Sequence, residues 1–204
     1  MNSPKEKLIE AFKKFPGVGP RQAQRFVYYL RTKPDSFIND LYGGIRDLKT
    51  QSKKCSRCNR FFDSMTQHDI CKTCSNTQRN HEQLMIVQRD IDLEHFESSD
   101  LFNGYYFVLG GTVPIGKQDD IPLYVRIPAL LNLIKEYSEH GLTEIILSLH
   151  INPEGEQTAD IVHKKIEEQY PDLKITKLGR GLSTGSEIEY ADKDTLKSAL
   201  DNRK

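Results

Sequence analysis

The chain contains no tryptophan and only 3 methionines among its 204 residues, and its apolar residues never form a long uninterrupted run. A membrane-spanning helix needs about 20 consecutive apolar residues, so the sequence predicts no such helix and no membrane contact. The first residues, Met1 to Glu10, are mainly polar and do not resemble a secretory signal segment. We therefore expect a cytoplasmic protein in a reducing compartment, where disulfides are rare.

The chain also lacks net charge, because 29 basic side chains balance 29 acidic ones. The two signs are unevenly distributed. Residues 1–60 contain 14 Lys or Arg against 5 Asp or Glu, whereas residues 61–204 contain 15 against 24. A basic region raises the local affinity for phosphate-rich polymers, and an acidic region repels them. The sequence therefore places any nucleic-acid contact near the N-terminus, unless the basic side chains only form a solvated surface.

Cysteine is scarce, and its spacing is informative. The chain has 4 cysteines in two C-x-x-C pairs separated by twelve residues: Cys55, Cys58, Cys71 and Cys74. Two such pairs form the tetrahedral four-sulfur shell that Zn²⁺ prefers, and a closed shell leaves no position for water. The spacing predicts one structural zinc ion per chain, with two disulfides as the disfavoured alternative. We interpret the nearby His68 and His81 as surface residues and not as ligands.

A glycine-rich turn separates two apolar helical patterns near the N-terminus. Apolar residues recur at helical spacing over residues 8–15 and again over residues 23–30. The glycines of the turn leave the backbone uncovered, and Pro20 is suited to begin a helix. The free N–H groups at the start of such a helix bind phosphate oxygens without reading base edges.

Two arginines follow this turn one helical turn apart and can contact adjacent phosphates. We predict sequence-independent, salt-sensitive DNA binding by the turn and these arginines. The predicted DNA contact comprises Gly17, Val18, Gly19, Arg21 and Arg25. The alternative is an ordinary helical hairpin that packs without touching DNA.

Farther along the chain, short apolar runs alternate with amphipathic helical patterns. A helix with a break at Gly43-Gly44 is expected over residues 37–48. Strands are then expected at 84–87, 105–109, 144–149 and 173–178, and helices at 127–137 and 158–170. This alternation predicts a mainly parallel sheet covered on both faces, with ligand positions in loops at the carboxyl ends of the strands.

One of those loops carries Glu154 and Glu156 on either side of a glycine. The two carboxylates could hold Mg²⁺ weakly or contact a partner, although a loop-surface or helix-capping role is the preferred interpretation. A phosphoryl-transfer site needs further acidic ligands from neighbouring strand ends, but the first strand is followed by Gln88. Asp90 and Asp92 lie close by in sequence and could supply such ligands, but solvated loop charges are an equal alternative.

No catalytic site is recognisable in the sequence. The chain has no Walker A loop, no H-x-E beside the cysteines and no locatable Ser-His-Asp arrangement. His150, at the end of the third expected strand, is interpreted as a hydrogen-bonded structural histidine. The sequence therefore predicts no catalytic residue.

The order of these parts resembles the RecR family of bacterial recombination mediator proteins over nearly the whole chain. The resemblance depends on Phe15–Arg25, the four cysteines, Val108–Gly111, Glu154–Ala159 and Leu178–Asp192. It implies an α+β multidomain fold. The implied parts are a helix-hairpin-helix DNA-binding domain at 1–52, a four-cysteine zinc finger at 53–78, a Toprim-like α/β domain at 79–176 and a short C-terminal segment at 177–204.

The resemblance also implies a non-catalytic, nucleoid-associated role in recombinational DNA repair. Members of the family act with RecO, and in some settings RecF, to load RecA on single-stranded DNA, and form ring-like tetramers or dimers. Their DNA-gripping basic residues match Arg21 and Arg25, and their zinc ligands match the four cysteines. Gln88 departs from the family pattern, since Toprim enzymes carry a glutamate there. A Mg-dependent Toprim-type nuclease or strand-joining enzyme and a zinc-ribbon regulatory protein are the alternatives.

Overall fold

The structure is a computed structural model that describes residues 3–63, 68–117, 120–179, 181–182, 184–185 and 187–203. The chain divides into two compact units, Met1–Ser52 and Lys53–Lys204. Within the family-like stretch Leu178–Asp192, three residues lie outside the described part: Arg180, Ser183 and Ser186. Among the described helices, none combines the length and apolar character that crossing a membrane requires.

The first unit consists of α1 (Pro4–Phe12), α2 (Pro20–Arg31) and α3 (Asp35–Gln51). Ser3 begins α1 with a capping box, in which its hydroxyl accepts from the Glu6 N–H and the Glu6 carboxylate accepts from the Ser3 N–H. The ring of Phe12 in α1 lies 5.5 Å from that of Phe26 in α2, beside the buried Val27. The apolar residues at helical spacing therefore join α1 to α2, as the sequence predicted.

The helix α3 runs without interruption through Gly43 and Gly44, so the expected break there is wrong. Each glycine costs about 1 kcal/mol relative to alanine in a helix, which a 17-residue helix can absorb. None of the residues of α3 is buried within the chain. Five of its large apolar residues are instead exposed: Phe37, Leu41, Tyr42, Ile45 and Leu48.

The second unit contains a sheet of four parallel strands in the order β4-β3-β5-β6. The strands are β3 (Asn80–Val87), β4 (Gly104–Val108), β5 (Glu144–Ser148) and β6 (Lys174–Lys177). The predicted parallel sheet is therefore confirmed. The central strand β3 starts earlier than residue 84, because polar residues at its beginning also pair with a neighbouring strand, as Gln83 does with Glu144.

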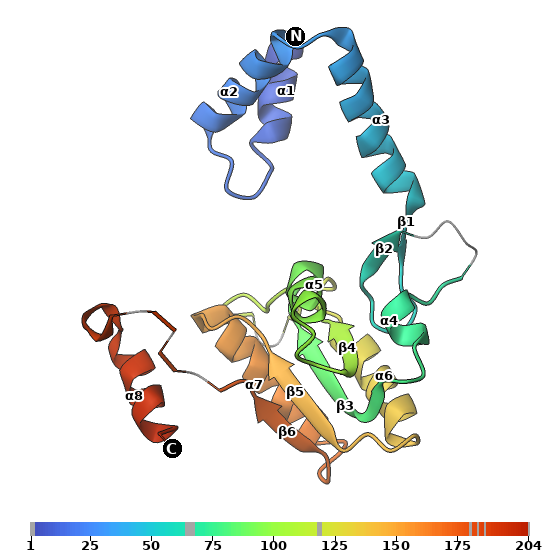
Figure 1. Ribbon diagram of the computed structural model, residues 1–204, viewed down its shortest axis with the longest axis vertical. Helices are drawn as coiled ribbons and strands as arrows, with labels where there is room; N and C mark the ends of the chain where they lie inside the picture. The colour runs from blue at the N-terminus through green and yellow to red at the C-terminus, as the bar shows by residue number, and fades with distance from the viewer. Residues whose placement is uncertain are drawn as a thin grey trace. The chain divides into compact units, whose positions relative to one another are not determined.

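Helices cover both faces of this sheet (Figure 1). Leu84 and Ile86 of β3 face the larger core, which α6 (Ile127–Ser138) and α7 (Pro153–Glu167) complete. Met85 and Val87 face the other side and pack in the same cluster as Leu93 of α5 (Asp90–Ser99). The sequence did not reveal α5, because Leu93 is its only buried residue.

Glu154 and Glu156 lie in the first turn of α7 and not in a loop, so the predicted helix start at residue 158 is wrong. The side chain of Asn152 caps this helix by accepting the Gly155 N–H at 2.8 Å. A Cβ on Gly155 would collide with the carbonyl oxygen of His150, so only glycine allows this close approach. The glycine between the two glutamates is therefore required by packing at the start of the helix.

Asp90 and Asp92 are not loop charges, the alternative that the sequence left open, because both belong to the first turn of α5. The Asp90 carboxylate accepts the backbone N–H of Phe61 at 2.6 Å. The Asp92 carboxylate accepts the N–H of Arg89 at 2.9 Å. Carboxylates at a helix start are favoured by its uncompensated N–H groups.

The remaining elements are short. A two-stranded sheet of β1 (Ser52–Lys54) and β2 (Phe61–Asp63), together with α4 (Lys72–Ser75), frames the cysteines. The C-terminal part contains the 3₁₀ turn η1 (Ile188–Tyr190) and α8 (Lys193–Asp201). The Asp192 side chain caps α8 by accepting the N–H groups of Asp194 and Thr195.

Candidate nucleic-acid interface and metal centre

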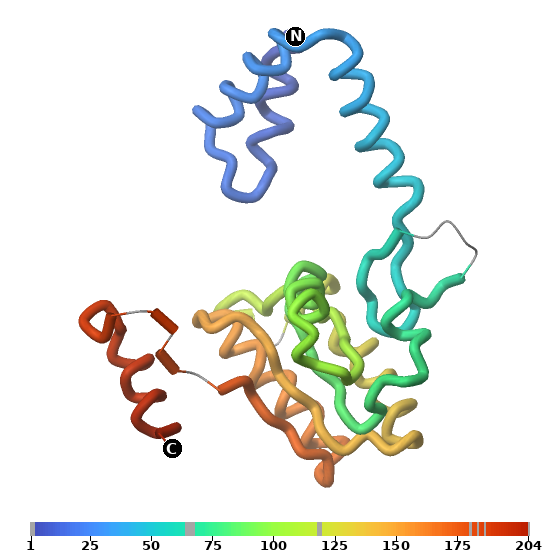
Figure 2. Tube along the Cα trace, viewed as in Figure 1, coloured from blue at the N-terminus to red at the C-terminus, as the bar shows by residue number. Residues whose placement is uncertain are grey.

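The turn between α1 and α2 leaves the start of α2 uncovered, and Figure 2 traces it as one loop at the end of the helix pair. Gly17 has a φ of +73°, which residues with a side chain rarely adopt, and the Val18 N–H donates to the Phe15 carbonyl at 3.1 Å. Gly19 is the N-cap of α2 and offers no side chain to the first N–H groups. A Cβ on Gly17 or Gly19 would meet no atom within 4 Å. A ligand oxygen can therefore approach these groups.

Arg21 and Arg25 are exposed on α2, one helical turn apart. Within the described part of the chain, neither guanidinium forms a hydrogen bond or an ion pair with another side chain. The apolar side of α2 is occupied by the buried Ala23 and Val27. The structure thus brings the five predicted residues together in one turn and the adjoining start of a helix, with both positive charges available.

The four cysteines converge on one point and are free thiols. Their sulfur atoms all lie within 4.8 Å of one another, and this is the only group of metal-ligand type found among the described residues. All four side chains are buried. Of the two histidines near this sequence, His68 is exposed and His81 packs against Tyr105, and neither joins the group.

The geometry and chemistry of this cluster fit a tetrahedral zinc ion. Zn–S bonds of about 2.3 Å place two sulfurs about 3.8 Å apart, and the sulfurs of Cys58 and Cys71 lie 3.7 Å apart. The Cys58 contact lowers the pKa of the Cys55 thiol, whereas the Cys55 contact raises that of Cys58. Four sulfurs this close cannot all ionise without a cation between them, so the residues are suited to hold a metal.

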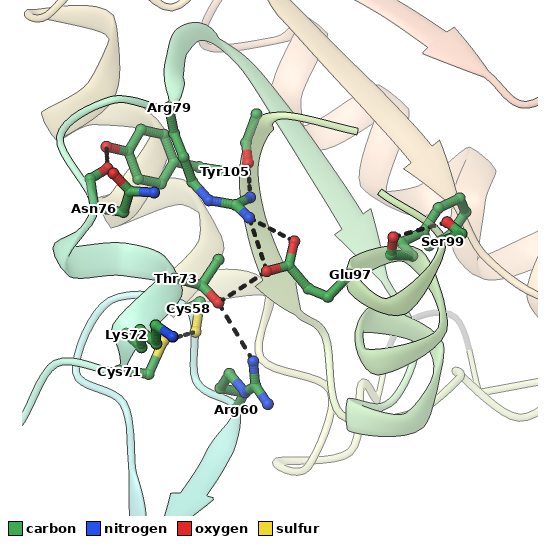
Figure 3. A network of polar contacts seen from close by, with 12 residues as sticks. Cys58, Arg60, Cys71, Lys72, Thr73, Asn76, Arg79, Glu97, Ser99 and Tyr105 are labelled. Atoms are coloured by element: carbon green, nitrogen blue, oxygen red, sulfur yellow. Dashed lines mark hydrogen bonds and ion pairs between the residues drawn. The ribbon is translucent and has the colours of Figure 1, made fainter. Parts of the chain in front are cut away.

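A polar network joins the cysteine region to α5 (Figure 3). The Arg79 guanidinium donates to both carboxylate oxygens of Glu97 at 2.7 Å and to the carbonyl of Gly104 at 2.6 Å. The Thr73 hydroxyl donates to the same carboxylate at 3.2 Å, and Arg60 reaches Thr73 at 3.5 Å. The network therefore connects α4, β4 and α5 through one nearly buried guanidinium.

Backbone contacts attach the loop formed by residues 55–60, which we call the metal loop, directly to the sheet. The carbonyl of Cys58 accepts the N–H of Val108 in β4 at 2.8 Å. The next carbonyl, of Asn59, accepts from the Arg126 guanidinium at 3.0 Å, and Arg126 also donates to the Val108 carbonyl at 3.1 Å. Asn59 has a φ of 61°, in the left-handed region, so the chain changes direction at this residue. The metal loop and the α/β fold are therefore parts of one packed structure.

The two glutamates of α7 are engaged in local contacts. Glu154 accepts from the Thr112 hydroxyl at 3.1 Å, and Glu156 lies 4.0 Å from the Lys177 ammonium. Among the described residues they do not combine with other acidic groups into a three-ligand cluster. Both side chains therefore make local contacts at the start of α7.

Gln88 and His150 meet at the carboxyl ends of the neighbouring strands β3 and β5. The Gln88 side-chain oxygen accepts the His150 N–H at 3.3 Å. The Nε2 atom of His150 lies 3.0 Å from the Arg89 guanidinium and 3.4 Å from the Asp92 carboxylate. The direct contacts of His150 therefore include one carboxylate, from Asp92, together with an amide and a guanidinium, whereas a metal-dependent phosphoryl-transfer site gathers several carboxylates.

Sequence reasoning missed Arg79, Glu97 and Arg126, which support the metal loop. Arg79 and Glu97 are 18 residues apart and lie in a turn-rich stretch and an unrecognised helix. Arg126 is 67 residues from the carbonyl that it holds. No local pattern marks such pairs, because single arginines and glutamates are common on protein surfaces.

Comparison with known proteins gives matches over nearly the whole chain. The family model described as "RecR, helix-hairpin-helix" matches residues 5–43, and that described as "RecR, C-terminal" matches residues 181–204. The chain is 34% identical to "Recombination protein RecR" of Ureaplasma urealyticum serovar 10, over 98% of this chain and 94% of that protein. The protein of the same name from Prochlorococcus marinus strain MIT 9215 is 35% identical over the same shares. That of Lactobacillus helveticus is 34% identical over 96% of this chain and 94% of its own length.

Proposed function

Since the chain belongs to the RecR family of recombination proteins, we propose that it is a non-catalytic DNA-binding mediator of recombinational DNA repair. In this proposal it acts with RecO, and with RecF where that protein takes part, to help load RecA on single-stranded DNA. It works as a ring-like tetramer or a dimer in the cytoplasm, at the nucleoid. The ion held by the four cysteines is Zn²⁺, in a structural role.

The turn of the first unit is the observation that carries this proposal. Phosphate oxygens bind to three features of this turn. These are the uncapped N–H groups at the start of α2, the unoccupied space beside Gly17 and Gly19, and two exposed arginines. Such contacts position a protein on DNA without sequence readout. The excess of basic residues over residues 1–60 strengthens the attraction.

The test is DNA binding by the double variant Arg21→Gln/Arg25→Gln. We expect weaker binding to non-specific DNA, because the variant can no longer neutralise two of the phosphates. On duplex DNA, the slope of log K against log salt should flatten by about 0.9 for each phosphate that is no longer neutralised. Fluorescence anisotropy at several salt concentrations measures both quantities.

A matched control is the double variant Lys193→Gln/Lys197→Gln. These lysines are also exposed and one helical turn apart, but they lie on α8 in the acidic part of the chain. The control should retain the affinity and the salt slope of the unaltered protein. An unchanged slope and affinity in the arginine variant would reject the assigned DNA contact.

We propose that the protein is not catalytic because of the residues at the carboxyl end of β3, where Gln88 lies. A buried amide stands where a Toprim enzyme needs a carboxylate, and it holds the backbone of His150. We expect no nicking or joining of supercoiled or single-stranded DNA with Mg²⁺ or Mn²⁺. Activity that Glu154→Gln abolishes would instead support the Toprim-type enzyme.

The partner and assembly proposals need their own measurements. RecA filament formation on DNA covered by single-strand binding protein should be slow, and adding RecO with this protein should shorten the delay. Acceleration by RecO alone, to the same extent, would contradict a mediator role. Mass measurement with and without DNA tests the ring, since encirclement requires a closed assembly.

A further inference from the structure

A cavity of about 360 Å³ lies at the amino ends of β3 and β4, away from the carboxyl-end edge of Gln88 and His150. It is lined by residues from the metal loop, both strands and the end of α6: Arg57, His81, Tyr105, Glu136, Tyr137 and His140. Its volume is in the range of small-molecule sites, roughly 300–1,000 Å³. All six residues belong to the second unit, so the cavity is formed within one compact body.

Three aromatic rings form the apolar part of this cavity. The Tyr105 ring lies 5.1 Å from the His81 ring and 5.3 Å from the Tyr137 ring, measured between centroids. Tyr105 and Tyr137 are only 3% and 7% exposed, so they are held in place, whereas His81 is exposed. An accessible ring that packs against a fixed ring is a platform on which a nucleobase can stack.

Charged groups line the other side of the cavity. The Arg57 guanidinium donates to the Cys74 carbonyl at 3.4 Å and lies 3.8 Å from the Glu136 carboxylate. These two contacts fix its direction but use only part of its five N–H donors. His140 is exposed in the turn after α6 and adds a second group able to contact an anion. The Glu136 carboxylate can accept from the exocyclic amino group of a base.

We propose that this cavity binds an unpaired nucleotide. The base stacks on His81, its amino group faces Glu136, and its phosphate contacts Arg57 and His140. A base inside a duplex is stacked on both faces and paired at its edge, so it must leave the helix before it can enter. The cavity therefore supplies a contact selective for single strands, which phosphate binding by the turn of the first unit does not.

This inference rests on the proposed DNA-binding function for the choice of ligand, but the cavity and the turn lie in different units. A base that carries a phosphate comes either from a free nucleotide or from a DNA strand. The two sources share the chemistry that the cavity recognises. The experiment therefore contains one arm for each source.

The DNA arm uses the full-length metal-loaded protein and a short single strand containing 2-aminopurine, whose fluorescence decreases on stacking. His81→Ala should weaken single-strand binding about five-fold or more and remove the decrease in fluorescence. Binding to the duplex of the same sequence should not change. His95→Ala, an exposed histidine on α5, is the matched control and should behave like the unaltered protein.

Arg57→Gln provides a second variant and should also weaken single-strand binding. Its metal content is measured, because Arg57 lies between two of the cysteines. The nucleotide arm uses deoxyadenosine monophosphate and the histidine ring resonances in the NMR spectrum. The resonances of His81 and His140 should shift on titration, and that of His95 should not.

Each outcome is decisive. Equal losses for single strand and duplex in His81→Ala, or no loss in either His81→Ala or Arg57→Gln together with unshifted resonances, would overturn the cavity assignment. Resonance shifts with unchanged strand binding would support nucleotide recognition and identify the free nucleotide as the source. If the protein bound no DNA but the shifts remained, the proposed function would fail while the cavity assignment stood.

Discussion

The carbonyl oxygen of Cys58 accepts a hydrogen bond of 2.8 Å from the N–H of Val108, the last residue of β4. A metal ligand is thereby bonded to an edge strand of the sheet. The neighbouring carbonyl of Asn59 is bonded to Arg126 at the start of α6. The metal site is therefore hydrogen-bonded to the α/β fold and is not an independent module on a linker.

Metal removal should destabilise the second unit as a whole. A strong chelator, or Cys71→Ser, should lower its free energy of unfolding by more than about 3 kcal/mol, because ligation orders the loop that carries Cys58. Thermal unfolding combined with elemental analysis measures this, and we expect one zinc ion per chain. Ser56→Ala, an exposed change within the same loop, should leave both values unaltered. Protein purified under reducing conditions without metal but with full stability would refute the structural role.

Glu97→Gln should lower the free energy of unfolding by about 3 kcal/mol. The substitution removes the carboxylate from Arg79, whose side chain is only 11% exposed, and leaves a nearly buried cation unpaired. Glu94→Gln on the same helix is the control, since its side chain is 61% exposed and lies 3.6 Å from Arg60. That change should cost at most about 1 kcal/mol. Equal effects in chemical denaturation would show that the Arg79 network is unimportant.

Glu144 should contribute to stability in a pH-dependent way. The bond from Gln83, together with contacts from Lys174 and Thr176, lowers the pKa of the Glu144 carboxyl below its ordinary value of 4.5. Its contribution is therefore fully present above the unfolded-state pKa and is lost as the pH falls through the folded-state pKa.

The corresponding measurement compares Glu144→Gln with the unaltered protein in denaturant at several pH values. The variant should be less stable at neutral pH and should lose less stability between about pH 5 and about pH 3, because it cannot lose this contribution. Glu139→Gln, at the end of α6, should retain the original pH profile. Identical profiles for Glu144→Gln and the unaltered protein would contradict the assignment.

Gly17→Ala should destabilise the first unit by about 1–2 kcal/mol, because alanine is strained at a φ of +73°. DNA affinity should fall with it, since the turn that presents the N–H groups is altered. Gly19→Ala is the matched control for stability, because Gly19 has a φ of −80° and space for a Cβ. Unfolding monitored by circular dichroism measures the stability of both variants. Equal stability would argue against a conformational requirement at Gly17.

Local spacing predicted the cysteine cluster and the turn after α1. The turn depends on adjacent residues, and the cluster depends on two C-x-x-C pairs whose spacing is itself a recognisable pattern. Apolar runs located the strands of the four-stranded sheet, although the polar beginning of β3 and the short strands β1 and β2 were missed. Two helix predictions were wrong: α3 continues through Gly43-Gly44, and α7 begins at Pro153 and includes Gly155, which lies close to the His150 carbonyl. In both cases tertiary context or helix length outweighed an intrinsic preference.

The contacts that unite the second unit could not be predicted from a single sequence. The Arg79–Glu97 pair and the His81–Tyr105 ring contact depend on the order of strands in the sheet. His81, which the sequence indicated only as a surface residue, lines a cavity. No spacing rule indicates this position. Long-range partners of polar residues become visible only when the topology is known.

The strand β6 has a neighbour on one side only within the described sheet. Lys174 and Lys177 stand at its two ends, with side chains 68% and 43% exposed. The unpaired N–H and C=O groups of an edge strand can pair with a strand of another molecule and so promote aggregation. Lysine ammonium groups oppose this pairing, because they repel one another and must stay hydrated. The two lysines thus protect the open edge of β6 from pairing with the strand edge of another molecule.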